Sequence, residues 1–118
     1  MIEILKPDFE FSDDRGKLTQ LVHQGFSQVN VIYSRAGSFR GGHYHKQNCE
    51  AFYIINGELE LTVSLGDTVE SYTFKSEDMF LIPENIVHSF RFSTDTLLVS
   101  MYNNGLEQAG GTKDIFTV

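Results

Sequence analysis

Residues 37–57 read G-S-F-R-G-G-H-Y-H-K-Q-N-C-E-A-F-Y-I-I-N-G. One residue separates His43 from His45, so an extended strand points both imidazoles to the same face, whereas a helix would splay them apart. If the chain turns back after His45, Glu50 begins the next strand and faces the same interior. His88 follows later in the chain as a fourth candidate ligand. This stretch therefore predicts a site on β-strands that gathers imidazoles and one carboxylate.

Such a donor set suits a divalent transition metal. Two histidines and a carboxylate bind Zn, Fe, Mn, Ni or Co and leave coordination positions open for water or substrate. A buried carboxylate without a cation or a hydrogen-bond donor would carry a large desolvation penalty, which favours a bound metal. The predicted metal ligands are His43, His45, Glu50 and His88.

The rest of the sequence predicts β-structure throughout. Short runs rich in Val, Ile, Phe, Tyr and Thr are broken by Gly, Asn, Asp and Ser, and helical periodicity is almost absent. Many short antiparallel strands indicate an all-β fold, a closed antiparallel β-barrel or jelly roll, because these architectures limit exposed sheet edges. We expect strands near Ile2–Leu5, Lys17–Val22, Gln28–Ser34, Gly42–His45, Ala51–Asn56, Glu58–Ser64, Val69–Phe74, Met79–Ile82, Val87–Phe92, Leu97–Tyr102 and Asp114–Val118.

Turn residues divide these strands. Asn56-Gly57 predicts a hairpin between the strands on either side, since both residues tolerate the positive φ of a tight primed turn. Gly66 marks the next reversal, and Pro83 interrupts the run before His88.

Length and charge restrict the class of protein. A chain of 118 residues fits a single domain, residues 1–118. No run approaches the roughly 18 apolar residues of a membrane helix, and the N-terminus lacks the features of a signal peptide, so we expect a cytoplasmic protein without a membrane partner. The only cysteine is Cys49, which excludes an intrachain disulfide. A net charge of −7 argues against nucleic acid as a partner.

The sequence resembles the cupin superfamily. The first cupin motif is matched in full by Gly37, His43, His45, Glu50 and Gly57. The second motif is matched at Asp78, Pro83 and His88, whereas Glu77, Asn85 and Phe92 depart from it. Asn85 can adopt the left-handed conformation that the family's glycine would supply. The resemblance implies a small β-barrel in which the four predicted ligands converge.

Two further segments are similar to cupins that act on nucleotide sugars. D-D-R-G-K-L (13–18) and R-G-G-H-Y-H-K (40–46) resemble segments of dTDP-sugar epimerases and 3,4-ketoisomerases. Residues 28–31 and 111–116 resemble the C-terminal cupin domain of bifunctional capsular-polysaccharide enzymes. The resemblance implies an isomerase or epimerase acting on a keto-sugar, a small-molecule ligand such as a nucleotide sugar, and a homodimer.

The implied reaction assigns roles to individual side chains. Proton removal next to a keto group gives an enediolate, which a divalent ion can stabilise. A metal-bound imidazole cannot also be the base, so His45 is a catalytic candidate chiefly for a metal-free reaction. Tyr102 is the first candidate to return the proton, ahead of Tyr33. Arg15 and Arg40 are the candidates for binding the substrate's pyrophosphate.

Two other functions fit the same residues. An Fe(II)-dependent cupin dioxygenase would use the His and Glu ligands to activate oxygen. A non-enzymatic cupin would bind a small ligand without turnover.

Overall fold

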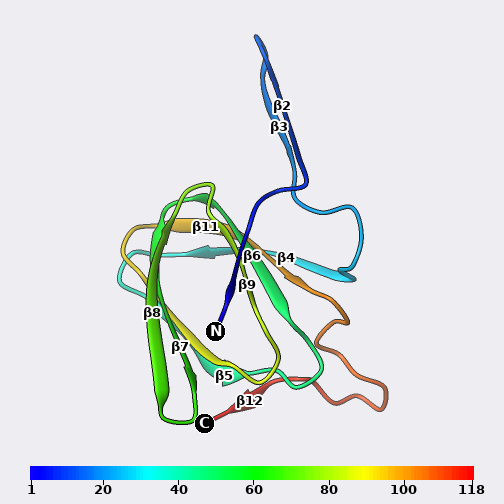
Figure 1. Ribbon diagram of the computed structural model, residues 1–118, viewed down its shortest axis with the longest axis vertical. Helices are drawn as coiled ribbons and strands as arrows, with labels where there is room; N and C mark the ends of the chain where they lie inside the picture. Colours follow the sequence, from blue (N-terminus) through cyan, green and yellow to red (C-terminus); the bar gives the residue numbers. More distant parts are fainter.

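The computed structural model describes residues 1–118 as twelve strands without a helix (Figure 1). Two five-stranded antiparallel sheets form the body of the molecule. Sheet I has the order β1 (Glu3–Leu5), β9 (Met79–Ile82), β6 (Glu50–Asn56), β11 (Thr96–Tyr102) and β4 (Gln28–Ser34). Sheet II has the order β12 (Phe116–Thr117), β5 (Phe39–Tyr44), β10 (Val87–Phe92), β7 (Glu58–Leu65) and β8 (Thr68–Lys75). The predicted all-β jelly roll is confirmed. No element of the structure is a helix long and apolar enough to span a membrane.

A third, two-stranded sheet stands clear of the other two. β2 (Phe9–Asp13) and β3 (Gly16–Gln20) pair as a hairpin that projects from the body of the molecule (Figure 1). β2 was not predicted from the sequence. Phe9 and Phe11 alternate with Glu10 and Ser12 over only four residues, which is a short signal, and both rings stay about half exposed.

The main core lies between sheets I and II. Along β7, Leu59, Leu61 and Val63 are completely buried, as the alternation in the sequence predicts. They belong to a cluster of twelve buried residues in which aromatic rings stack closely, with 4.1 Å between the ring centroids of Phe74 and Phe80. This core holds the two sheets face to face and leaves one end of the space between them for polar side chains.

The outer face of sheet I is also apolar. Ala51, Tyr53, Met79 and Met101 form a second buried cluster there, packed against partly buried residues that include Phe26. On the edge strand β4, by contrast, Val29, Val31 and Tyr33 are between 55% and 67% exposed. The outer face of sheet I is thus buried over its middle strands and exposed to solvent along the edge strand β4.

The Asn56-Gly57 prediction of a hairpin is wrong. β6 lies in sheet I and β7 in sheet II, so the turn carries the chain from one sheet to the other. Gly57 has φ +124°, and a Cβ there would lie 2.7 Å from the carbonyl oxygen of Asp95. Glycine is required at this turn because its backbone lies against Asp95 and Thr96, where β11 begins.

Candidate active site and metal centre

A cavity of about 390 Å³ opens between the two sheets. Sheet I contributes lining residues from β4, β6 and β11, and sheet II contributes them from β5 and β10. Most of its wall is apolar, and four of its polar lining residues, His43, Glu50, His88 and Tyr102, lie close together. The lining residues are Ile32, Phe39, Arg40, Gly41, His43, Glu50, Phe52, His88, Phe90, Phe92, Leu98, Tyr102 and Ile115.

Glycines before the histidine pair set its position. The register of β5 on β10 shifts between His88 and Ser89, and this irregularity places His43 directly opposite His88. Gly41 has φ +109°, and a Cβ there would lie 2.6 Å from the His88 carbonyl oxygen. The close approach of the two strands therefore depends on glycine at this position.

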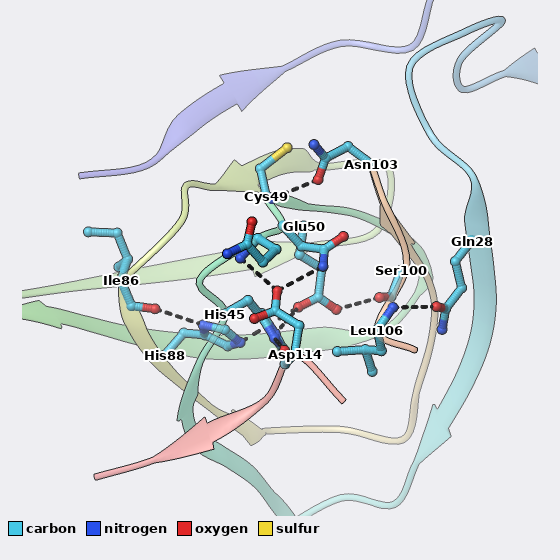
Figure 2. Close-up of polar contacts among 12 residues, drawn as sticks. Gln28, His45, Cys49, Glu50, Ile86, His88, Ser100, Asn103, Leu106 and Asp114 are labelled. Atoms are coloured by element: carbon cyan, nitrogen blue, oxygen red, sulfur yellow. Dashed lines mark hydrogen bonds and ion pairs between the residues drawn. The ribbon is translucent and has the colours of Figure 1, made fainter. Parts of the chain in front are cut away.

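The four predicted ligands meet in one place. One ligand atom from each of His43, His45 and His88 lies within 4.8 Å of the other two. The Oε1 atom of Glu50 lies 3.2 Å from His45 Nε2 and 3.6 Å from His88 Nε2 (Figure 2). The sequence therefore predicted correctly which side chains converge.

Hydrogen bonds fix the direction in which two of the imidazoles point. His45 Nδ1 lies 2.6 Å from the Asp114 carbonyl oxygen, and His88 Nδ1 lies 3.0 Å from that of Ile86 (Figure 2). A carbonyl only accepts, so each Nδ1 carries a proton, and in the neutral ring each Nε2 presents a lone pair. Both Nε2 atoms are buried without a hydrogen-bond partner and face the Glu50 carboxylate.

Three acceptor atoms that face one another in a buried site need a positive charge between them. A divalent cation satisfies all three, and imidazole nitrogen with carboxylate oxygen is a donor set that transition metals bind. The residues present therefore fit a metal ion, with His43 as a further ligand.

Burial and charge act differently on the three imidazoles. Burial lowers the pKa of His88 to about 4 and also lowers that of His43, which keeps both rings neutral near pH 7. Burial opposes protonation of His45 as well, but the nearby Glu50 carboxylate and the hydrogen bond to the Asp114 carbonyl outweigh burial and raise the pKa of His45. Without a metal, His45 is the imidazole best able to carry the compensating proton.

Two neighbours on β11 complete the polar side of the cavity. Ser100 is fully buried and donates a 2.5 Å hydrogen bond to Glu50 Oε2, which leaves Oε1 facing the imidazoles (Figure 2). The Tyr102 ring meets His45 edge-on, with 5.2 Å between centroids. Burial and the nearby Glu50 charge raise the pKa of Tyr102, so its hydroxyl stays protonated.

The other candidates from the sequence separate in space. Arg40 lines the cavity, and its guanidinium donates to Ser34 Oγ at 2.8 Å. Arg15 lies in the turn of the projecting hairpin, paired with Asp13, and does not line the cavity of its own chain. Tyr33, the second candidate to return the proton, is exposed and does not line the cavity.

Sequence reasoning missed Ser100 and Asp114. Ser100 could have been found from its spacing, because it lies two residues before Tyr102 on one strand and so shares its face. Asp114 had no such signal, since it follows a long loop and reaches His45 only through the fold.

A jelly roll that encloses three histidines and a glutamate defines a cupin. Residues 11–110 match the family model described as the polysaccharide biosynthesis C-terminal domain, and the chain belongs to that family. No curated protein matches the sequence.

Solved structures agree on the fold. The sugar 3,4-ketoisomerase QdtA from Thermoanaerobacterium thermosaccharolyticum, in complex with TDP, is 16% identical with a TM-score of 0.81, covering 99% of this chain and 88% of that one. A 3,4-ketoisomerase from Helicobacter canadensis is 20% identical with a TM-score of 0.82, covering 99% and 90%. CapF, solved with 3-isopropenyl-tropolone, is 21% identical with a TM-score of 0.71, covering 93% of this chain but only 34% of CapF.

Proposed function

We propose that this protein is a metal-binding cupin of sugar-nucleotide or polysaccharide metabolism that isomerises or epimerises a keto-sugar. The observation that carries the proposal is the pair of unpartnered Nε2 atoms on His45 and His88, which face Glu50 at the side of the cavity between the two sheets. QdtA, whose fold this chain shares, has been solved with TDP and with TDP-4-keto-6-deoxyglucose. That likeness supports a nucleotide-sugar ligand.

The proposed metal ligands are His43, His45, Glu50 and His88. A divalent ion bound there would polarise the substrate carbonyl and stabilise the enediolate oxygen. Ser100 holds the carboxylate in place through its hydrogen bond. The apolar wall of the cavity, which includes Phe52 and Phe90, excludes water from the reacting carbons.

The chain's own side chains move the protons. Tyr102 lines the cavity with its hydroxyl protonated, so it can donate a proton to the enediolate. Without a metal, a neutral imidazole can remove the first proton. His43 lines the cavity and His45 does not, so we assign this role to His43 in preference to His45, the residue first expected in it.

Charge at the cavity supports phosphate binding by Arg40. Its guanidinium is exposed and held by Ser34 and the Tyr33 carbonyl, so its direction is fixed before a ligand arrives. Arg15 remains a proposed substrate-binding residue only if a second chain brings it to a cavity.

We also propose that residues 1–118 form one cupin domain that works as a cytoplasmic homodimer. The exposed Val29, Val31 and Tyr33 lie on an edge strand beside an already apolar sheet face. Such a patch is uncharged and can pack against itself about a twofold axis, so a second copy is the partner it fits.

The deciding experiment combines elemental analysis with a reaction assay. Protein purified without added metal should contain a transition metal, and a TDP-linked 4-keto-sugar in D₂O should exchange the proton next to its keto group without consuming oxygen. Oxygen consumption with bound iron would instead identify a dioxygenase. Tight binding without exchange or turnover would identify a ligand-binding cupin.

A further inference from the structure

The C-terminal strap, residues 103–118, returns to the candidate site. Its last strand, β12, pairs with β5 so that Phe116 lies opposite Tyr44 and Thr117 opposite His43. Ile115 lines the cavity. The strap is therefore part of the wall around the site, although nothing in its sequence suggested a role there.

Asp114 joins this strap to the backbone that follows His45. Its carboxylate is buried and accepts hydrogen bonds from the amides of Lys46 at 2.9 Å and Gln47 at 2.8 Å. It also accepts one from the Asn48 side chain at 2.8 Å. Three donors on one buried carboxylate hold it in a single orientation.

The main chain of Asp114 binds the imidazole itself. The carbonyl accepts the His45 Nδ1 proton at 2.6 Å (Figure 2). The amide donates to the Leu106 carbonyl at 2.7 Å. One residue thus holds both the side chain of His45 and the backbone directly after it. Turning the ring, or moving its proton to Nε2, would leave the buried Asp114 carbonyl without a donor.

We propose that Asp114 is a positioning residue that keeps the proton of His45 on Nδ1 and its Nε2 lone pair directed at Glu50. The inference deepens the proposed function, because His45 needs a bare Nε2 whether it binds a metal or accepts a proton. It does not depend on which of these roles His45 has.

The test follows the tautomer of His45 by long-range ¹H–¹⁵N NMR on protein stripped of metal, at a pH where His45 is neutral. Wild type should show a protonated Nδ1 and a bare Nε2. Asp114→Asn keeps the shape but places an amide NH₂ against backbone donors, and Asp114→Ala removes the acceptor. Both variants should show a mixture of tautomers at His45 and an affinity for Zn²⁺ about 10- to 100-fold lower.

Gln108→Ala is the matched control. Its side chain bonds only to carbonyls within the strap, at Gly105 and Leu106, and not to Asp114. The substitution therefore loosens the strap and leaves every hydrogen bond of the Asp114 carboxylate in place. This variant should keep the wild-type tautomer and an affinity within about twofold.

Three results would overturn the inference: a wild-type His45 protonated on Nε2, folded Asp114 variants with the wild-type tautomer, or an equal effect of Gln108→Ala. If the Asp114 variants do not fold, the test uses wild type alone. It then measures the scalar coupling between His45 Nδ1 and the Asp114 carbonyl carbon across their hydrogen bond, and the absence of this coupling overturns the inference. Wild type that binds no Zn²⁺ and turns over no keto-sugar, yet shows the Nδ1 tautomer, would refute the proposed function and leave this inference standing.

Discussion

Tyr102 lies directly opposite Glu50 where β11 pairs with β6, so both side chains point into the same cavity. The pairing places a protonated hydroxyl beside the carboxylate that faces two imidazoles. The pairing of the two strands thereby holds the Tyr102 hydroxyl, a proton donor, at a fixed distance from the Glu50 carboxylate, a proposed metal ligand.

Tyr102→Phe removes that donor and keeps the ring. We expect kcat to fall by about 10²- to 10⁴-fold, the usual range for loss of a general acid, with KM nearly unchanged. Steady-state kinetics on a keto-sugar checks this. Tyr33→Phe, on the exposed face of β4, is the control and should match wild type. A Tyr102→Phe enzyme with wild-type kcat would remove Tyr102 from the mechanism.

Glu50→Gln replaces the charged ligand with a neutral amide of the same shape. We expect metal content after purification to fall well below that of wild type, because the imidazoles would face no negative charge that balances a divalent ion. Elemental analysis measures the metal. Glu60→Gln, exposed on β7, should leave it unchanged. Equal metal content in Glu50→Gln and wild type would show that Glu50 is not a ligand.

The hairpin is linked to the barrel by a charge pair with a predictable pH dependence. Lys17 on β3 donates a 2.5 Å hydrogen bond to Glu77 and holds the pKa of that carboxyl below its ordinary value of 4.5. The pKa of Glu77 is lowered when the hairpin is bound to the barrel, so the pair contributes its full stabilisation of this contact above pH 4.5. The contribution is lost as pH falls through the lowered pKa of Glu77.

Carbon-detected NMR titration should therefore give Glu77 a midpoint below 4.5 in wild type and an ordinary midpoint in Lys17→Met. Lys75→Met, on β8, is the control and should keep the wild-type midpoint. An unshifted Glu77 in wild type would contradict the pairing.

The apolar edge of sheet I predicts how the chain self-associates. Val31→Lys puts a charge in the middle of the patch, and we expect it to convert a dimer to a monomer, because two buried like charges would meet near the twofold axis. Sedimentation or light scattering gives the mass. Thr62→Lys, exposed on β7 of sheet II, should stay dimeric. A wild-type monomer at high concentration would refute the homodimer.

The local sequence pattern was sufficient to predict most strands and to predict that the four candidate ligands converge. The i, i+2 spacing of His43 and His45 fixes their common face, and Asn85 has the expected left-handed φ of 66°. Prediction failed where the alternating pattern was short: Phe9 and Phe11 alternate with Glu10 and Ser12 over only four residues, and Phe9–Asp13 was not recognised as β2. The Asn56-Gly57 turn was identified, but its sequence does not say whether the next strand pairs with the last or crosses to the other sheet.

The sequence by itself determined the all-β class and the four candidate ligands, because side-chain alternation and donor chemistry are local properties. Tertiary structure alone decided the orientation of the His45 imidazole, since that depends on a carbonyl 69 residues away at Asp114. It also decided that Arg40 lines the cavity while Arg15 does not. The physical reason is that hydrogen-bond partners and cavity walls come from strands far apart in the chain, and their meeting depends on how the sheets pack.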